Sequence, residues 1–399
     1  MPEIKAFKAY RYNSDVVGRY DKVLTPPYDV ISPKQRDAFY KKSPYNFVRI
    51  DLRKTSGGRD AYSSASKQLN DWIRKKVFVS EEKPSVYVYV QDYKSLSNKK
   101  TTRYGFFSLM KINEKKVKKH ENTLSGPKKD RMRLMKKTRA QMSPIMGLFQ
   151  DKSGSAHKAL VRISKRKPII DIKTDDVRHR LYIESDPETL KSIQKAVKPS
   201  NMYIADGHHR FEVANQFKKV SKIKGSEYIF TYLCDADRND FTIYPTHRML
   251  QGLDDAWRHD FADIVAKYFE ATEHKTLADL EKAIGTPAKK VSVGAFVDGK
   301  YLQLTLKKTT KDLDTTVLDQ YLIRPLLGED VAGSDRYFYT RDSSEVVALV
   351  KKKKADAGFF LSKMPIQEMI RVSDKGVKLP QKSTYFYPKL LSGMLFYKF

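Results

Sequence analysis

The sequence predicts a mixed α/β (α+β) fold for this chain of 399 residues. Short runs rich in β-branched and aromatic residues alternate with segments whose apolar residues recur every three or four positions, a pattern typical of strands alternating with helices. Hydrophobic residues make up 40% of the chain and aromatic residues 12%, which is enough for a packed core and too much for a disordered chain. Because no tandem repeat or heptad pattern is present, we expect neither a solenoid nor a coiled coil.

The predicted strands are short runs bounded by polar residues. In the sequence SVYVYVQDY, Tyr87 and Tyr89 fall on one face of the strand and the intervening valines on the other, because strand side chains alternate with a period of two. Strands are predicted at residues 47–52, 86–91, 104–110, 202–205, 228–234, 291–296 and 301–306.

The predicted helices carry apolar stripes. Ala61, Ala65, Leu69 and Trp72 recur at three- and four-residue steps and would lie on one helical face. Helices are predicted at residues 59–75, 187–197, 208–219, 254–269, 276–284 and 343–353.

A chain of this length is expected to form more than one domain. We predict a core with large insertions over residues 1–252 and an α+β portion over residues 253–399. The last segment, residues 382–399, is dense in aromatic residues and is expected to return to the core.

The chain is strongly basic, with 77 Lys and Arg against 47 Asp and Glu and a net charge of +30. A basic surface attracts phosphate groups. The expected partner is a phosphorylated small molecule. Nucleic acid is a less favoured alternative, because few of the lysine runs are interleaved with the aromatic residues of a single-strand binding face.

The single cysteine, Cys234, cannot form an internal disulfide. The first residues lack the apolar segment of a signal peptide, and no apolar run approaches the roughly 18 residues that span a bilayer. We therefore expect a soluble, cytoplasmic protein without a membrane partner, whose oligomeric state the sequence leaves open.

The most informative motif lies at residues 201–214, NMYIADGHHRFEVA. An apolar run predicts a strand, Asp206 and Gly207 predict a tight turn, and the apolar residues that follow predict a helix. Free backbone N–H groups and the positive end of the helix would meet at this turn, which makes it a candidate anion site. His208 and His209 could donate or transfer protons, and Arg210 could bind a phosphate through its planar fork.

Alternatives at this motif remain open. Asp206 could act only as a helix cap. A metal site is less favoured, because adjacent histidines point in different directions from a helix. We expect Arg210 to lie in an exposed first turn, so that its replacement would affect binding more than folding.

A second basic segment, residues 118–139, contains HENTLSGPKKDRMRLMKKTR. Glu121 could accept a hydroxyl proton or hold magnesium. Lys128, Asp130 and Arg131 could contact a phosphorylated substrate, since transferred phosphoryl charge must be offset. Gly126 and Pro127 predict a turn between these groups. The alternative is a solvated basic loop and helix.

Further candidates lie elsewhere along the chain. Two prolines before Tyr28 and Asp29 would present this pair at a defined angle, with Asp29 as a metal ligand, a hydroxyl ligand or a turn cap. His247 and Arg248 follow Pro245 at a predicted strand end and are candidate phosphate ligands. Near the C-terminus, the candidate substrate contacts are Lys382, Ser383, Thr384 and Lys389, although this segment could equally be a core strand.

The spacing of Gly207, Arg210, an aromatic residue and Ala214 resembles the phosphate-binding helix of the ParB/sulfiredoxin superfamily. The longer string ADGHHRFEVA resembles one branch, the family called domain of unknown function 1015, whose members are often labelled SpoOJ/ParB-like. Six further strings carry the same resemblance: LTPPYDVIS, SPYNFVRI, HENTLSGPKKDR, SPIMGLF, YPTHR and LPQKSTYFYPKL. The resemblance implies a ParB/sulfiredoxin-like core with large insertions.

Differences within the superfamily narrow the functions that this resemblance implies. Sulfiredoxins carry a cysteine where this chain has His208, and ParB proteins carry a helix-turn-helix that is not evident here. Free-serine kinases use the same helix to hold ADP or ATP phosphates, with a metal and a carboxylate base. The resemblance therefore implies a nucleotide-dependent phosphotransferase that acts on a small hydroxylated metabolite, with free serine or phosphoserine as the first candidate. Its cofactors would be ATP, ADP or another nucleotide together with Mg²⁺, and its catalytic candidates are Asp206, His208, His209 and Glu121. The alternative is a nucleotide-gated regulatory or nucleic-acid-binding protein without small-molecule catalysis.

Overall fold

The computed structural model describes residues 2–55, 60–96, 98–121, 123, 125–238, 241–286, 288–328, 335–380 and 382–399, and it has the predicted mixed α/β fold. Residue contacts divide the chain into two compact units. Unit 1 comprises residues 1–119, 123–242 and 386–399, and unit 2 comprises residues 120–122 and 243–385. The main segment of unit 2 thus begins at Ile243, whereas the sequence analysis placed the division after residue 252. The chain re-enters unit 1 at Phe386.

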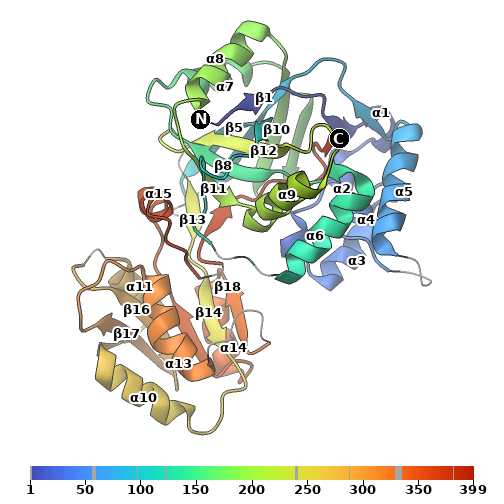
Figure 1. Ribbon diagram of the computed structural model, residues 1–399. Coiled ribbons are helices and arrows are strands. Elements are labelled where there is room, and N and C mark those ends of the chain that lie inside the picture. The colour runs from blue at the N-terminus through green and yellow to red at the C-terminus, as the bar shows by residue number, and fades with distance from the viewer. Residues whose placement is uncertain are drawn as a thin grey trace. The chain divides into compact units, whose positions relative to one another are not determined.

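Unit 1 is built on a mixed sheet with the strand order β6-β11-β8-β12-β5-β4-β10-β9, to which β1 adds by pairing with β5 (Figure 1). Its strands are β1 (Ile4–Lys5), β4 (Val86–Lys94), β5 (Lys100–Lys111), β6 (Val117–Lys118), β8 (Ile145–Phe149), β9 (Ile170–Thr174), β10 (Val177–Glu184), β11 (Met202–Asp206) and β12 (Tyr228–Asp235). The β8–β12 and β6–β11 pairs are parallel, and the other pairs are antiparallel. Two small sheets pair β2 (Tyr10–Tyr12) with β3 (Phe78–Ser80), and β7 (Ala140–Gln141) with β21 (Tyr397–Lys398).

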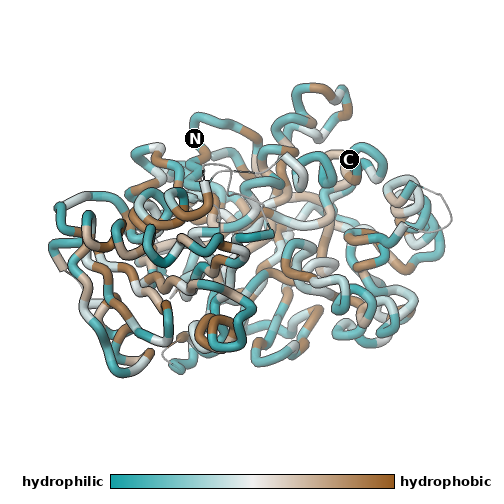
Figure 2. Tube along the Cα trace, turned by 90° about the horizontal axis from the view of Figure 1, so that it is seen from below, coloured by the Kyte–Doolittle hydropathy of each residue, from teal (hydrophilic) through white to brown (hydrophobic). Residues whose placement is uncertain are grey.

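The two faces of β4 pack differently, as the alternation of valine and tyrosine predicts. Val86, Val88 and Val90 join a core cluster that also contains residues of the helices α7, α8 and α9. On the other face, Tyr87 donates to the Phe7 carbonyl and Tyr89 packs edge-on against Tyr232. Along the coloured part of the trace, brown hydrophobic and teal hydrophilic stretches are intermixed (Figure 2), as expected for elements that bury part of their surface.

The helices of unit 1 include every helix predicted in that part of the chain. They are α1 (Ser14–Val17), α2 (Tyr20–Val23), α3 (Pro33–Lys42), α4 (Val48–Asp51), α5 (Ala61–Arg74), α6 (Ser125–Thr138), α7 (Ser155–Ile163), α8 (Pro187–Val197) and α9 (His208–Val220), together with a 3₁₀ turn at Tyr28–Val30. Ala65, Leu69 and Trp72 of the predicted stripe are buried on α5.

Two local predictions in unit 1 are wrong. The predicted strand at residues 47–52 is instead the short helix α4, because the Asn46 side chain accepts from Val48 N (3.1 Å) and starts a helical turn. A short buried apolar run does not distinguish helix from strand by its periodicity. The predicted turn at Gly126 and Pro127 lies inside the first turn of α6, where proline is tolerated because the first helical N–H groups have no partner within the helix.

Unit 2 contains an antiparallel sheet with the order β15-β17-β16-β19-β14-β18. Its strands are β14 (His247–Leu250), β15 (Phe269–His274), β16 (Ser292–Val297), β17 (Lys300–Leu306), β18 (Tyr337–Thr340) and β19 (Ala357–Phe360). Its helices are α10 (Trp257–Tyr268), α11 (Leu277–Gly285), α12 (Asp314–Leu318), a π-helical turn (Asp319–Ile323), α13 (Arg324–Leu327), α14 (Ser343–Lys351) and α15 (Ile366–Asp374). Strands β13 (Thr242–Tyr244) and β20 (Tyr385–Tyr387) carry the chain between the units.

No helix within the described part of the chain combines the length and the apolar character needed to cross a membrane.

A buried histidine in unit 1 gives a testable pH dependence. His179 of β10 contacts Tyr89 Oη (2.6 Å) and Thr174 Oγ1 (2.9 Å), and burial lowers its pKa to about 3. Since an unfolded histidine has a pKa near 6.5, the unfolded state takes up a proton first as the pH falls. The contribution of His179 to stability is therefore complete above about pH 6.5 and is lost progressively towards pH 3.

We expect His179→Gln to reduce the slope of the unfolding free energy against pH by up to about 1.4 kcal/mol per pH unit between about pH 6 and 4. Urea unfolding at a series of pH values measures this slope. The control is His259→Gln, because the His259 side chain is 81% exposed. Parallel curves for His179→Gln and the wild type would contradict the prediction.

Candidate anion-binding site

The predicted strand–turn–helix motif is present at β11, Gly207 and α9. Gly207 is the N-cap of α9 and has φ +94°, and as a glycine it has no side chain with which to cap the helix. A Cβ at Gly207 would lie 3.0 Å from Ile145 Cγ2 and 3.1 Å from Arg210 Nε. Glycine is therefore required for both its conformation and its size. The start of α9 thus places backbone N–H groups and the positive helix end at a glycine turn.

Asp206 and Arg210 form an ion pair across this turn. Arg210 donates to the Asp206 carboxylate and to the Pro144 carbonyl, and Lys389 also donates to Asp206. The side chains of these three charged residues are only 11–17% exposed. The expectation that Arg210 lies in an exposed turn is wrong, because its guanidinium group is held by the Pro144 carbonyl and the Asp206 carboxylate. Asp206 binds two cations, so a helix cap is not its whole role.

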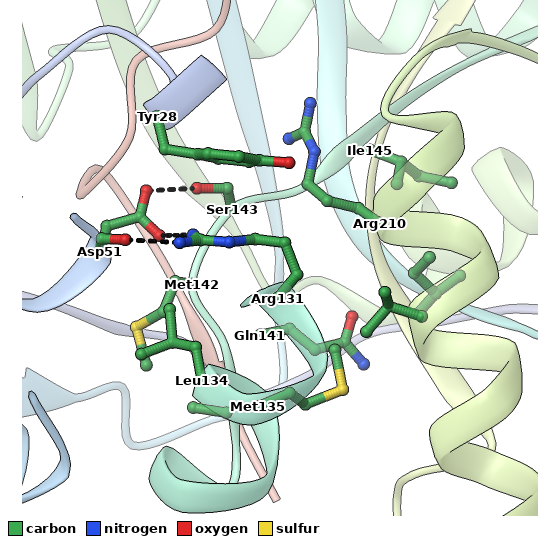
Figure 3. Close-up of a pocket in the computed structure, with 13 residues that line it drawn as sticks. Tyr28, Asp51, Arg131, Leu134, Met135, Gln141, Met142, Ser143, Ile145 and Arg210 are labelled. Atoms are coloured by element: carbon green, nitrogen blue, oxygen red, sulfur yellow. Dashed lines mark hydrogen bonds and ion pairs between the residues drawn. The ribbon is translucent and has the colours of Figure 1, made fainter. Parts of the chain in front are cut away.

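A small cavity of ≈ 40 Å³ lies beside Arg210 (Figure 3). One water needs about 10–15 Å³ by this measure, so the cavity has room for about three waters and is too small for a whole nucleotide. Its walls combine apolar side chains of α6 and α9 with a polar group from each of several distant segments. The polar lining residues are Tyr28, Asp51, Arg131, Gln141, Ser143 and Arg210.

A buried ion pair forms one wall of this cavity. Arg131 Nη1 donates to Asp51 Oδ1 (2.7 Å), and Nη2 donates to the Asp51 carbonyl (2.9 Å). The guanidinium carbon of Arg131 lies 3.9 Å from the centre of the Tyr28 ring, within cation–π range. Ser143 Oγ lies 3.4 Å from the other Asp51 oxygen, and in Figure 3 the Tyr28 ring lies over the Arg131 guanidinium.

Burial determines the proton equilibria of these groups. It raises the pKa of Tyr28 to about 12, so this phenol stays neutral at physiological pH. It also raises the pKa of Asp51, although the neighbouring Arg131 and Arg210 oppose this shift. Burial lowers the pKa of Arg131, but the nearby carboxylates of Asp51 and Asp130 raise it by more, so the net shift is upward. Arg131 is therefore a permanent cation at the cavity.

Sequence reasoning named Tyr28, Arg131 and Arg210 and missed Asp51 and Ser143. Both missed residues adjoin or begin strings that carry the family resemblance, SPYNFVRI and SPIMGLF. An acidic residue directly after a buried apolar run was the available signal for Asp51.

The other candidates in unit 1 have different surroundings. Lys128 Nζ binds Glu212 of α9 (3.1 Å). Asp130 accepts from the Tyr62 hydroxyl (2.8 Å) and from Arg131. Asp29 is exposed in the 3₁₀ turn beside Tyr28, whereas His208 is buried and His209 is half-buried at the start of α9.

The remaining candidates belong to unit 2, and their predicted roles stay predictions. Glu121 forms an isolated parallel bridge with Leu379, and Thr384 Oγ1 lies 3.1 Å from His120 Nε2. Burial lowers the pKa of His247 to about 4. Three further candidates in this unit are Arg248, which packs over the Tyr339 ring (4.4 Å), Ser383, which donates to the Pro380 carbonyl (2.5 Å), and Lys382, which has φ +57°.

The described residues contain neither an exposed thiol nor a cluster of metal-binding side chains. Cys234 is buried in β12, and burial raises the pKa of its thiol to about 12. No group of three or more His, Cys, Asp or Glu side chains within the described residues could hold a metal ion.

The requirement for glycine at residue 207 leads to a stability prediction. We expect Gly207→Ala to lower the free energy of unfolding by at least about 1–2 kcal/mol, because alanine disfavours this left-handed conformation and its Cβ crowds Ile145. Thermal unfolding measures the effect. Gly18→Ala separates the two causes, since Gly18 has φ +65° and open space around it. An equal loss in both variants would contradict the crowding, and no loss in Gly207→Ala would contradict the strain as well.

The fold and the site together define an α/β protein with a glycine turn at a helix start and buried cations. The chain belongs to the family described as "Protein of unknown function (DUF1015)", whose match covers residues 4–321. This confirms the predicted resemblance to that family. The relationship to ParB stays a prediction. No curated protein matches the sequence.

Several solved structures are similar to this chain at low identity. A conserved hypothetical protein from Pyrococcus furiosus is 13% identical, with 72% of this chain and 92% of that chain covered and a TM-score of 0.40. A free serine kinase in complex with AMP is 11% identical, with 71% and 86% covered and a TM-score of 0.40. SbnI with a C-terminal truncation, from Staphylococcus aureus, is 10% identical, with 72% and 85% covered and a TM-score of 0.40.

Proposed function

We propose that this protein binds the phosphate groups of a nucleotide at the start of α9 and transfers a phosphoryl group between that nucleotide and a small hydroxylated metabolite. The observation that carries the proposal is the glycine turn at the start of α9, Gly207, with Arg210 and Lys389 at the same turn. Backbone N–H groups, a helix dipole and two cations together favour a phosphate.

The distribution of charge supports the same conclusion. Unit 1 contains 54 Lys and Arg and 26 Asp and Glu, a net charge of +28, whereas unit 2 contains 23 and 21, a net charge of +2. Nearly the whole excess of the chain therefore belongs to the unit that contains the helix start. Such a field raises the local concentration of anionic ligands.

The proposed roles follow the chemistry of phosphoryl transfer. The metabolite hydroxyl oxygen bonds to the terminal phosphorus of ATP or ADP, the bond from that phosphorus to the bridging oxygen breaks, and a carboxylate takes the hydroxyl proton. Glu121 is our candidate for that base, and His208 or His209 is our candidate for the group that donates to the leaving phosphate. The proposed contacts to the transferred group and the substrate are Tyr28, Lys128, Asp130, Arg131, His247, Arg248, Lys382, Ser383, Thr384 and Lys389.

Mg²⁺ is the metal that the proposal includes. It commonly binds one or two carboxylates together with substrate phosphates and waters, so it does not require a preformed cluster. Asp29, exposed beside the cavity residue Tyr28, and Glu121 are the candidate ligands. The ion would offset the negative charge of the transferred group.

Free serine, with phosphoserine for the reverse reaction, is the first substrate to test because of the resemblance to the superfamily of the free-serine kinases. The experiment incubates the full chain with Mg²⁺, ATP, ADP or pyrophosphate, and a panel of hydroxylated metabolites, and follows products by ³¹P NMR. We expect a new phosphomonoester signal with one metabolite. Lack of any turnover combined with salt-dependent retention on DNA or RNA would overturn the proposal in favour of the nucleic-acid-binding alternative.

A further inference from the structure

Arg103 of β5 is a fully buried arginine that has no carboxylate partner among the residues the structure describes. Its side chain is among the largest that are completely buried. Nε donates to Gln91 Oε1 (3.1 Å), and Nη2 donates to the same oxygen and to the Pro388 carbonyl (2.5 Å). Nη1 is buried and has no hydrogen-bond partner among the described residues. All acceptors of this cation are therefore neutral.

The surroundings of Arg103 do not neutralise its charge. The ionisable groups around it are Tyr89, Tyr93, Tyr232, Cys234 and His179. Burial raises the pKa of Tyr89 well above its usual range and that of Cys234 to about 12, and it lowers the pKa of His179 to about 3. These groups carry no charge at physiological pH. Arginine is rarely buried without a partner, because an isolated charge in a protein interior is strongly disfavoured.

The contacts of Arg103 lead directly to the helix start. Arg103 holds the carbonyl of Pro388, and Gln91, its neighbour across the β4–β5 pair, donates to the carbonyl of Lys389 (3.1 Å). The ammonium group of Lys389 in turn pairs with Asp206. Arg103 and Gln91 thus hold the segment that places Lys389 beside Gly207 and α9.

The charges linked in this way do not balance. Four cationic side chains but only two carboxylates are buried, or nearly buried, among the described residues at the cavity, at Asp206 and in the C-terminal segment. Two further carboxylates act on these cations from exposed positions and are therefore screened: Asp130, which contacts Arg131 and has a side chain that is 40% exposed, and Asp29, whose charge acts on Arg210. The cations are Arg103, Arg131, Arg210 and Lys389, and the carboxylates are Asp51 and Asp206.

We propose that the start of α9 takes a ligand with about two negative charges, such as a phosphate dianion or a nucleotide diphosphate, and that Arg103 is the positioning residue that supplies the unbalanced charge and holds Lys389. This inference rests on the proposed function. It deepens that function by stating the charge that the ligand must carry. A singly charged carboxylate or an uncharged nucleoside would leave the excess positive charge in place.

The test is calorimetric titration of ADP and of adenosine into the full-length wild type and its variants. Arg103→Met removes the charge and the donors, whereas Arg103→Lys keeps the charge. We expect Arg103→Met to weaken ADP binding about tenfold, or about 1.4 kcal/mol, and Arg103→Lys to restore most of this loss. Adenosine should bind weakly to all of them. The control is Arg180→Met, because Arg180 of β10 has its own carboxylate partner, Asp92.

Gln91→Glu is a second variant that tests the charge independently. A carboxylate at this position would neutralise Arg103 and keep an acceptor oxygen for it, so we expect ADP binding to weaken about as much as in Arg103→Met. This variant decides the question if Arg103→Met does not fold.

Each outcome separates the inference from the function on which it rests. If the wild type binds no ADP, the proposed function itself fails. If the wild type binds ADP and neither Arg103→Met nor Gln91→Glu changes the affinity, only the role of Arg103 is overturned. Equal losses in Arg103→Met and Arg103→Lys would overturn the role of its charge and leave only a structural one.

Discussion

Replacing Asp51 with alanine is expected to lower the free energy of unfolding by about 3–5 kcal/mol, because it leaves the buried Arg131 guanidinium without its counter-ion. The Arg131 and Asp51 side chains are 9% and 3% exposed, so water cannot replace the lost carboxylate. Urea unfolding monitored by circular dichroism measures the loss.

The control for this prediction is an exposed pair of the same chemistry. Arg178 and Asp171 lie 2.6 Å apart, with side chains 53% and 36% exposed. We expect Asp171→Ala to cost less than about 1 kcal/mol. Adding Arg131→Met to Asp51→Ala should recover much of the loss, since an apolar pair removes the unpaired charge. Similar small losses in Asp51→Ala and Asp171→Ala would contradict the account of the buried pair.

Replacing Arg210 with alanine is expected to weaken nucleotide binding ten- to hundredfold, which corresponds to about 1.5–3 kcal/mol for a charge-assisted contact. The structure adds an effect on stability that the sequence did not predict. Without Arg210, the Pro144 carbonyl loses a donor. Asp206, which pairs with Arg210 and Lys389, then loses the first of these two cations. We therefore expect thermal unfolding to shift downward as well.

Two variants separate charge from geometry at this position. Arg210→Lys keeps the charge and cannot bridge two acceptors as a planar fork, so its affinity should lie between those of the wild type and Arg210→Ala. Lys219→Ala removes one charge from the exposed end of the same helix and should change neither property. Wild-type affinity in Arg210→Ala would contradict a role for Arg210 in binding.

The sequence predicted most of the fold because the long elements repeat regularly. The stripe of α5 buries the face that its period defines, and the alternation of β4 places valines and tyrosines on two opposite faces, both of which are buried. The short segment that forms α4 was predicted incorrectly, because its conformation depends on the side chain of Asn46. Asn46 also donates to the Lys22 carbonyl, a contact between segments that are distant in the sequence.

The candidate site was predictable only where it is local. Gly207 and Arg210 lie within four residues on one strand–turn–helix motif, so the sequence reveals their proximity. Asp51 and Ser143 join the cavity only after α4 and the segment before β8 meet, and no periodicity reports that contact. The burial of Arg210 likewise depends on Pro144, which is 66 residues away in the sequence.

The central claim is that phosphate groups bind the backbone at the start of α9. Amide hydrogen exchange with and without ATP and Mg²⁺ tests it most directly, because the first N–H groups of a helix lack partners within the helix. The account predicts slower exchange at residues 207–210 and no change at the start of α8, where the Asp186 side chain already accepts from Thr189 N (2.9 Å). Unchanged exchange at residues 207–210 under conditions in which ATP is bound would contradict the account.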